Sequence, residues 1–381
     1  MGYHTQNDAP LMKQYCCAEV TAILDMVPIV KNLARKKFIV LFVLSMIKTR
    51  AVQFCEIAQE LNDEVKASSN ETRIQDFFRE VELDYEQLAI LLAMFLPKRG
   101  KLTLCIDRTE WDFGKCQVNI LMIVVRCKHV TIPLYWELLD NNSGNSNTAD
   151  RIKLLKKCIG LLGSRISLFL ADREFIGHRW LKFLKDQGIY FCVRVPKHHQ
   201  VGRYSGIDEH VHKVELLLKD RKVLRISNCR VDGVWGNVYI KRLADGELLY
   251  LFGTVKTELL SQMYKKRWRI ECFFQNVKKR GFDLESTHLK DLDKLKKLVG
   301  LVSIAYVIVA NVGLHACLKG EGIPVKNHGY KANSFSRKGI DIVREGLRRK
   351  WKRNFQVFLD WVVRLLRWMQ LNPNNLPLPE F

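Results

Sequence analysis

The chain has 381 residues, enough for two or three structural units with sizeable hydrophobic cores. Hydrophobic residues make up 48% of the chain, charged residues 27%, and only 9 residues are proline, which excludes a disordered, collagen-like or low-complexity protein. The 62 Lys and Arg against 40 Asp and Glu leave a net charge of +22, and a polyanionic partner such as nucleic acid best explains that excess.

The positive charge is concentrated in the later part of the chain. Residues 1–100 carry 12 basic and 13 acidic side chains, whereas residues 101–381 carry 50 against 27, so we expect the polyanion to bind mostly there. The 11 cysteines are scattered, with neither a disulfide framework nor a Cys-x2-Cys zinc knuckle. This usage favours reduced cysteines in a cytoplasmic protein, and the first ten residues show no export or anchoring signal.

Residues 11–96 are predicted to be helical, because apolar residues recur there at helical spacing. The apolar run 38–47 and the amphipathic run 72–96 are the clearest examples. Two short helices followed by a third allow a helix-turn-helix that reads DNA, and a plain packing domain is the equal alternative.

At residue 101 the pattern changes to strand-like runs. Runs 101–107, 117–127 and 129–139 are rich in Val, Ile and aromatic residues and predict an antiparallel meander. A helix near 151–163, a strand near 166–174, a helix near 178–187 and a strand near 189–195 are expected to follow. The predicted order is therefore three strands, helix, strand, helix, strand, which is a mixed α/β arrangement.

Residues 196–257 consist of short alternating runs and are predicted to be a β-rich insertion. Asp-Gly pairs at 232–233 and 245–246 lie between strand-like runs and predict hairpin turns. Helical patterns return from residue 258. Residues 298–318 contain no charged side chain and are long enough to span a bilayer, but Asn311 and His315 interrupt them, so we predict a buried core helix.

Two apolar strands each end in an aspartate. Asp107 ends the first predicted strand and Asp172 ends the fourth. A carboxylate at the end of a rigid strand is a common metal-ligand position, because the adjoining loop leaves room for substrate. Most aspartates after strands instead serve turns or caps, so either residue alone is weak support for a catalytic site.

A helical stripe supplies the third element. Tyr264, Arg267, Glu271 and Lys278 are spaced by three, four and seven residues, which places them on one face of a predicted helix. The alternative is an exposed helix with ordinary ion pairs. Apolar side chains of the same helix are expected to pack against a core: Trp268, Ile270, Phe273, Phe274 and Val277.

This helix matches the Tyr-x2-Arg-x3-Glu-x6-Lys signature of bacterial insertion-sequence transposases of the DDE type, and the chain resembles that family over about residues 100–320. The resemblance implies an RNase H-like catalytic core, a mixed sheet flanked by helices. It also implies that Asp107, Asp172 and Glu271 form the catalytic triad. The insertion at 196–257 accounts for much of the separation between Asp172 and Glu271.

The chemistry of such an enzyme explains the residue types. Two Mg²⁺ or Mn²⁺ ions held by carboxylates activate a water or 3′-hydroxyl and neutralise the leaving oxygen of a phosphodiester. We assign Asp107 as the bridging ligand, and Asp172 and Glu271 as ligands of one ion each. The expected function is cut-and-paste mobilisation of an insertion sequence; the alternatives are an RNase H-like nuclease without transposition and a catalytically decayed DNA-binding protein.

The resemblance further implies that Tyr264, Arg267 and Lys278 contact phosphates near the cleaved end. Some relatives stack a flipped base on tryptophan while forming a DNA hairpin, and Trp268 or Trp235 is a candidate for that role here. Residues 331–368 carry 11 basic and 3 acidic side chains and are expected to contact DNA or a second protomer. The central basic residues of this segment are Arg348, Arg349, Lys350, Lys352 and Arg353.

Other polar clusters are weaker candidates. Glu110, Asp112 and Glu174 are expected to stabilise the local structure, or to contact the residues that bind the metal without binding it themselves. The absence of a phosphate-binding GxxxxGK[ST] loop argues against ATP hydrolysis. Four histidines of the insertion are expected to lie on the surface or face DNA rather than to bind zinc, since no cysteine pair accompanies them: His198, His199, His210 and His212.

These predictions combine into one organisation. We expect a helical N-terminal domain with possible DNA-end binding at 1–100. The catalytic core is expected in two parts, at 101–195 and 258–320, with the β-rich insertion between them at 196–257. A basic helical C-terminal region is expected at 321–381. The expected partner is double-stranded DNA, both transposon inverted-repeat ends and target. We expect a homodimer on DNA, no membrane, and a bacterial cytoplasmic protein that joins the nucleoid when bound to DNA.

Overall fold

The computed structural model of the protein describes residues 20–22, 24–113, 116–139, 146–197, 199–202, 208–210, 218, 221–327 and 329–347. The chain divides into two compact units. Unit 1 comprises Met1–Arg99, Cys127–Ile132 and Phe273–Phe381, and unit 2 comprises Gly100–Arg126 and Pro133–Cys272. The N-terminal helices therefore belong to the same unit as the helices that follow residue 273.

Unit 2 is built on a 10-stranded sheet with the order β3-β2-β1-β4-β5-β10-β9-β8-β6-β7. The strands are β1 (Leu102–Phe113), β2 (Cys116–Arg126), β3 (Thr131–Leu138), β4 (Ile166–Ala171), β5 (Tyr190–Arg194), β6 (Gln200–Gly202), β7 (Asp208–His210), β8 (Val223–Val231), β9 (Val234–Arg242) and β10 (Leu248–Gly253). The accompanying helices are α6 (Thr148–Leu162), the 3₁₀ turn η1 (Gly163–Arg165), α7 (His178–Asp186) and α9 (Thr257–Lys265).

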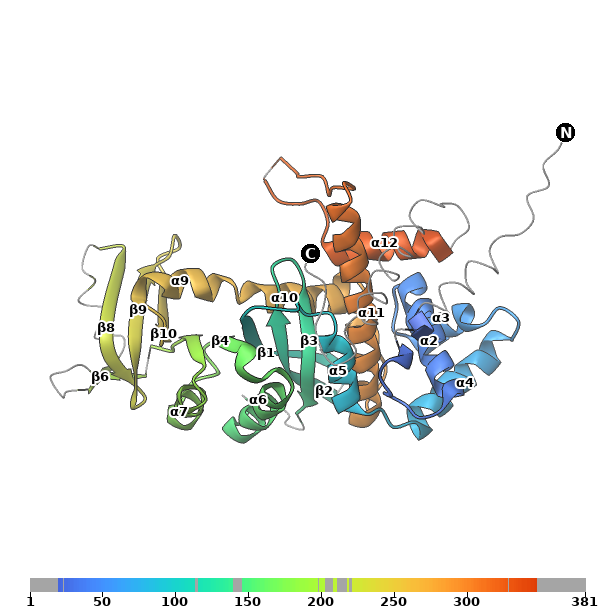
Figure 1. The fold of residues 1–381 in the computed structure, drawn as a ribbon, viewed down its shortest axis with the longest axis horizontal. Coiled ribbons are helices and arrows are strands. Elements are labelled where there is room, and N and C mark those ends of the chain that lie inside the picture. Colours follow the sequence, from blue (N-terminus) through green and yellow to red (C-terminus); the bar gives the residue numbers. More distant parts are fainter. Residues whose placement is uncertain are drawn as a thin grey trace. The chain divides into compact units, whose positions relative to one another are not determined.

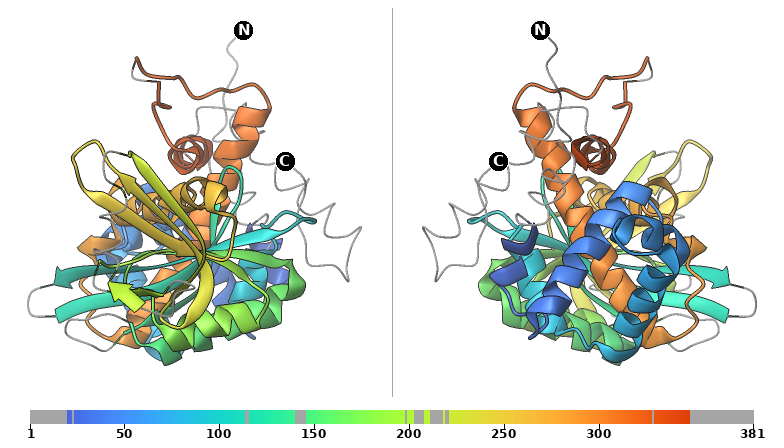
Figure 2. Two further views of the ribbon diagram at one scale, coloured as in Figure 1. Left: turned by 90° about the vertical axis from the view of Figure 1, so that its left-hand side faces the viewer. Right: turned by 90° about the vertical axis from the view of Figure 1, so that its right-hand side faces the viewer.

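The first half of this sheet is the predicted catalytic core. Strands β1 and β2 form an antiparallel hairpin, whereas β4 pairs in parallel with β1 on one side and with β5 on the other. Because parallel neighbours need a crossover, α6 precedes β4 and α7 precedes β5. These two helices lie along one side of the sheet and α9 along the other (Figures 1 and 2). The predicted mixed α/β core, a sheet flanked by helices, is confirmed.

The second half of the sheet comes from the segment predicted to be β-rich. Strand β10 pairs antiparallel with β5, so these strands extend the core sheet. The Asp232-Gly233 pair forms the predicted turn between β8 and β9, and both residues have positive φ (49° and 77°), as a type I′ hairpin turn requires.

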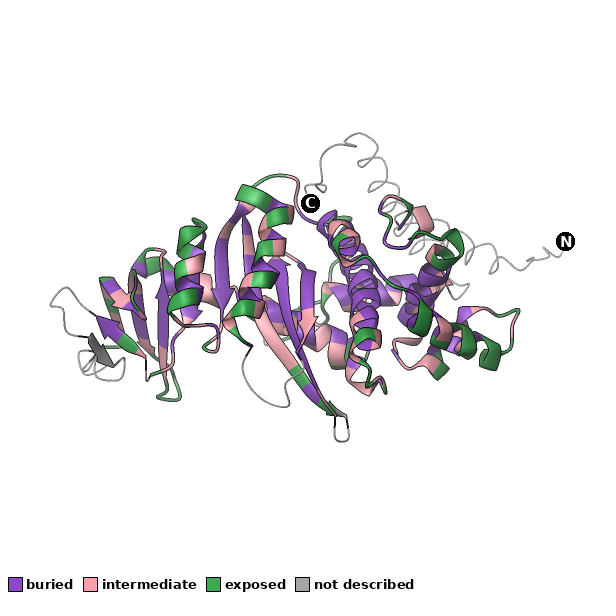
Figure 3. Cartoon of the chain, turned by 90° about the horizontal axis from the view of Figure 1, so that it is seen from below, coloured by how far each residue is buried: buried purple, intermediate pink, exposed green. Residues whose placement is uncertain are grey.

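Unit 1 is helical and is organised around one long apolar helix, α11. Its helices are α2 (Leu33–Thr49), α3 (Phe54–Leu61), α4 (Ala67–Glu80), α5 (Tyr85–Ala93), the π-helical segment η3 (Asn276–Arg280), the 3₁₀ turn η4 (Leu284–Ser286), α11 (Leu292–Leu318) and α12 (Phe335–Leu347). Helices α2, α4, α5 and α12 all contact α11. Nearly the whole length of α11 is buried (Figure 3).

Helix α11 is the core helix predicted from the uncharged run. It is long and apolar enough to cross a membrane, but 89% of its most apolar window is buried inside the protein, as in the core helix of a soluble protein. Two of its buried polar side chains donate hydrogen bonds: Asn311 donates to the Val307 carbonyl, and the Lys297 ammonium donates to the Phe78 carbonyl, both at 2.8 Å. Such bonds remove most of the cost of burying polar atoms.

Helices α11 and α12 approach each other at two glycines. A Cβ atom added to Gly339 would lie 1.7 Å from the Val309 carbonyl oxygen, and one added to Gly313 would lie 1.9 Å from the Phe335 carbonyl oxygen. These separations are far below van der Waals contact, so only glycine lets the two backbones approach this closely.

Candidate active site

Asp107 lies within strand β1 rather than at its end. Its position pairs with Met122 on β2, and β1 continues to Phe113, so the prediction that the strand ends at Asp107 was wrong. The parallel pairing of β1 with β4, however, stops at Cys105. Asp107 therefore lies just beyond the point where β1 leaves β4, while the hairpin partner β2 keeps the backbone extended.

Asp172 directly follows β4, as predicted. The last residues of β4 are held between two neighbours, since Leu170 pairs with Cys105 on β1 and with Cys192 on β5. The chain then turns, and the Phe175 amide donates to the Asp172 carbonyl at 3.0 Å. The Asp172 carboxylate is thus fixed beside Asp107 by paired backbone on both sides.

Glu271 lies in α10 (Trp268–Gln275), which is separated from α9 by a short break. Across the break, the Arg267 amide donates to the Tyr264 carbonyl at 2.9 Å and the Ile270 amide donates to the Arg267 carbonyl at 3.0 Å. These are bonds between residues three apart, as in a 3₁₀ turn. The predicted single helix is therefore two helices with Arg267 at the junction.

The stripe predicted on that helix is only partly formed. Tyr264, Arg267 and Glu271 come together, whereas Lys278 lies in the π-helical segment η3 of unit 1, where its ammonium is 2.8 Å from a Glu285 carboxylate oxygen. The backbone therefore changes from α-helical to π-helical between Glu271 and Lys278.

Three carboxylates of unit 2 converge on the Arg267 guanidinium. Its Nη1 is 2.8 Å from Asp107 Oδ2, and its Nη2 is 4.0 Å from Asp172 Oδ2 and donates to Glu271 Oε1. The Tyr264 hydroxyl donates to Asp172 Oδ1 at 3.0 Å. The structure thus brings Asp107, Asp172 and Glu271 together across 164 residues of sequence.

Burial and neighbouring charge shift the ionisation of this cluster. Burial raises the pKa of Asp107 to about 6, with smaller upward contributions from Asp172 and Glu271, while Arg267 and the Arg108 amide act in the opposite direction. Burial also raises the pKa of Tyr264, so its hydroxyl keeps its proton. Burial opposes the charge on Arg267, but Tyr264 and the three carboxylates favour it and raise its pKa overall.

We expect the free energy of unfolding of the metal-free protein to decrease as the pH rises from about 4 to about 6, because of the ionisation of Asp107. Its pKa is about 6 in the folded protein and 3.8 ordinarily, so the folded state binds more protons in this range and loses that advantage as the pH rises. The contribution is on the order of 2 to 3 kcal/mol. Urea unfolding of wild type and Asp107→Asn in EDTA measures it, and parallel pH profiles for the two proteins would contradict it.

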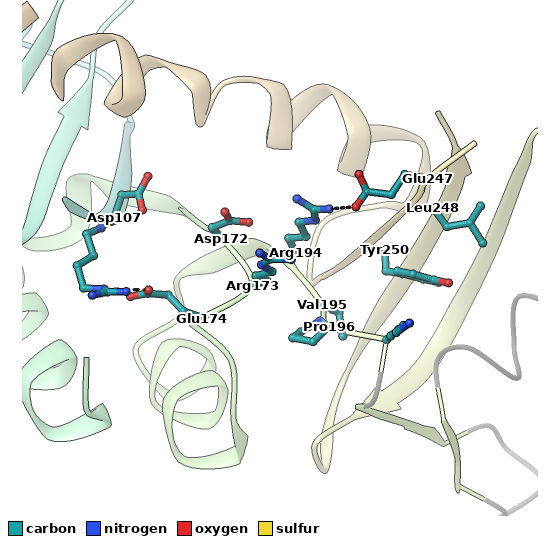
Figure 4. A pocket seen from close by; sticks show the side chains of 12 residues that line it. Asp107, Asp172, Arg173, Glu174, Arg194, Val195, Pro196, Glu247, Leu248 and Tyr250 are labelled. Atoms are coloured by element: carbon teal, nitrogen blue, oxygen red, sulfur yellow. Dashed lines mark hydrogen bonds and ion pairs between the residues drawn. The ribbon is translucent and has the colours of Figure 1, made fainter. Parts of the chain in front are cut away.

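A cavity of about 880 Å³ opens beside the aspartates (Figure 4). Asp107 and Asp172 lie at one end of it in the view of Figure 4, and Glu247, Leu248 and Tyr250 lie at the other. Basic side chains line the cavity: Arg108, Arg173, Arg194 and Lys197.

Sequence reasoning missed these cavity-lining residues, although Arg173 directly follows Asp172. Two of the arginines are held by carboxylates: Arg108 pairs with Glu174 at 3.1 Å and Arg194 pairs with Glu247 at 2.6 Å. Arg173 is exposed and makes no ion pair with the part of the chain that the structure describes. The sequence feature that could have identified Arg173 is its position as a basic residue directly after a strand-end aspartate.

The remaining predicted residues have ordinary surroundings or lie outside the described ranges. Glu110 and Glu174 both pair with Arg108, which agrees with a local structural role. Trp268 is 57% exposed and so does not pack in the core as predicted, because the helix turns its other apolar side chains inward; Trp235 is 44% exposed. The basic residues Arg348, Arg349, Lys350, Lys352 and Arg353 lie outside the described residues.

The described residues hold no ready metal cage of three or more His, Cys, Asp or Glu side chains. His199 instead pairs with Asp232, with its Nδ1 2.9 Å from Oδ1. His198 and His212, and the side chain of His210, lie outside the described residues. The carboxylates that suit a hard divalent cation are Asp107, Asp172 and Glu271, each turned toward Arg267.

One comparison with known protein families covers the region of this site. The family model described as Transposase DDE domain matches residues 99–308, a range that contains all three converging carboxylates. A crystal structure of human ENDOV shares 12% sequence identity, with coverage of 58% of this chain and 96% of that chain and a TM-score of 0.25. No curated protein matches the chain. Because the family model spans more than half of the sequence, this chain belongs to the transposase DDE domain family.

Proposed function

We propose that the protein is a DNA transposase that cleaves phosphodiesters at the ends of an insertion sequence and transfers those ends into target DNA. The observation that carries this proposal is the convergence of Asp107, Asp172 and Glu271 on the buried Arg267 guanidinium, inside a transposase DDE domain. We further propose that it works as a homodimer on DNA in the bacterial cytoplasm.

The three carboxylates fit a pair of divalent cations by their donor chemistry. Mg²⁺ and Mn²⁺ prefer oxygen ligands, and the cluster offers six carboxylate oxygens beside an open cavity. Asp107, Asp172 and Glu271 would hold the ions, which would activate the attacking water or 3′-hydroxyl and neutralise the leaving oxygen. Tyr264 donates a hydrogen bond to Asp172 and so orients that carboxylate.

The cavity beside the aspartates suits a DNA strand. Arg173 and Lys197 line it and carry the positive charge that phosphates attract, and Arg194 lies between Arg173 and Glu247 in Figure 4. The exposed indoles of Trp268 and Trp235 are both candidates for stacking a flipped base, if a DNA hairpin forms.

A strand-transfer assay separates this function from its two alternatives. The protein, a duplex that carries the element's ends and a supercoiled plasmid are incubated with Mg²⁺, and the joints are sequenced. Joined products flanked by a short direct duplication support transposition. Cleaved ends without joints indicate a nuclease, and bound but uncleaved ends indicate a decayed enzyme.

We expect cleavage to require Mg²⁺ or Mn²⁺ and to be inhibited by Ca²⁺, which binds oxygen ligands with a larger radius and looser geometry. Zinc-selective chelation should have little effect, since the proposed ligands are carboxylates. The measurement is cleavage of a labelled end duplex with each ion and in excess EDTA. Undiminished turnover in EDTA would rule out the metal-dependent mechanism.

A further inference from the structure

The Arg267 guanidinium lies among the three carboxylates and contacts all of them. It is 8% exposed, and in the described part of the chain it is the side-chain cation that contacts Asp107, Asp172 and Glu271. Its charge therefore compensates the repulsion among three carboxylates that the fold brings together.

This arrangement is incompatible with full coordination of a divalent cation by the same oxygens. Asp107 Oδ2 and Glu271 Oε1 each accept a hydrogen bond from the guanidinium, so those oxygens point at a donor nitrogen. A metal ion there would face a positive charge at contact distance, and the mutual repulsion would be strong in a partly buried site.

We propose that Arg267 is an internal counter-cation that competes with the divalent ions for the carboxylates and must leave before they bind. The inference rests on the proposed metal-dependent function, and it identifies Arg267 as the side chain that lowers the affinity of the carboxylates for metal. Metal loading then frees a guanidinium beside the cavity, where a DNA phosphate is the complementary partner.

Two features of Arg267 favour a side chain that changes partners over a permanent structural ion pair. Its Nε is buried and has no hydrogen-bond partner among the described residues, so the bound state leaves one donor unsatisfied. It also lies at the break between α9 and α10, where the 3₁₀-type bonds replace the α-helical ladder. Asp107 and Asp172 line the open cavity, which gives an incoming ion access to them.

Isothermal titration of the metal-free full-length protein with Mn²⁺, without DNA, tests the competition. We expect Arg267→Ala to bind Mn²⁺ roughly tenfold or more tightly than wild type, because the competing charge is gone. Arg267→Lys keeps a charge but loses the planar fork that spans the carboxylates, so its affinity should lie between the two. Arg194→Ala is the matched control: it removes a cavity arginine that pairs with Glu247, and its Mn²⁺ affinity should change by less than about threefold.

A stability measurement covers the case in which Arg267→Ala folds poorly without metal. The rise in melting temperature on adding Mn²⁺ should be larger for Arg267→Ala and Arg267→Lys than for wild type, because tighter ligands stabilise the folded state more. Equal or weaker Mn²⁺ binding by both variants overturns the competition. If Asp107→Asn and wild type bind Mn²⁺ identically, the proposed metal site itself is wrong, which is a different failure.

Discussion

Cleavage of a transposon-end duplex should fall by at least roughly a thousandfold when Asp107, Asp172 or Glu271 is replaced by Asn or Gln. Each substitution keeps the size of the side chain but removes one of the carboxylates that converge on Arg267. Because these groups act on the transition state more than on docking, end binding should stay within about tenfold of wild type.

The matched control for this triad is Asp112→Asn. Asp112 is an exposed carboxylate on the same strand as Asp107, so it tests the loss of a negative charge from that strand without touching the cluster. Cleavage rates and gel-shift titrations are measured together for all four variants. A triad variant with nearly wild-type cleavage in Mg²⁺ would remove that residue from the catalytic set.

Replacement of Gly339 by Ala should destabilise unit 1 by at least about 3 kcal/mol. The added methyl group would lie 1.7 Å from the Val309 carbonyl oxygen and 2.6 Å from its carbon, both backbone atoms that cannot rotate away. Helices α11 and α12 would have to separate, which exposes apolar surface of the core helix. Urea unfolding followed by circular dichroism measures the change.

Gly322→Ala is the control for Gly339→Ala, because no atom lies within 4 Å of a Cβ added at Gly322. Its stability should stay within about 1 kcal/mol of wild type. A Gly339→Ala protein as stable as this control would show that α11 and α12 tolerate a wider separation than the close contact indicates.

Local patterns were sufficient to predict the mixed α/β core. Three strands, then two strands that each follow a helix, were readable because buried strands are rich in Val, Ile and aromatic residues and helices repeat at 3.6 residues. Asp107, Asp172 and Glu271 were proposed as the triad because each occurs in a short motif that resembles those of the DDE family, and the structure brings the three together. The uncharged run 298–318 was also predicted correctly as a core helix, since Asn311 and His315 interrupt its apolar residues.

Tertiary pairing decided what local patterns could not. Strand β1 runs past Asp107 because β2 continues to pair with it, and that partner is not visible in the residues around Asp107. The predicted helix breaks at Arg267 and becomes π-helical over Asn276–Arg280, so the four residues do not lie on one continuous α-helix. Long-range packing also placed the N-terminal helices around α11, because that helix needs apolar cover from distant segments.

The amino-acid sequence by itself was sufficient to single out the candidate residues for the chemistry of this protein, Asp107, Asp172, Glu271 and Arg267, from their motifs and spacing. Only the tertiary structure decided how they act on one another, since the contact of Arg267 with all three carboxylates joins segments that lie 160 and 95 residues apart along the chain. Such a contact depends on where the mixed sheet and a distant helix meet, which nothing in the local residue pattern encodes.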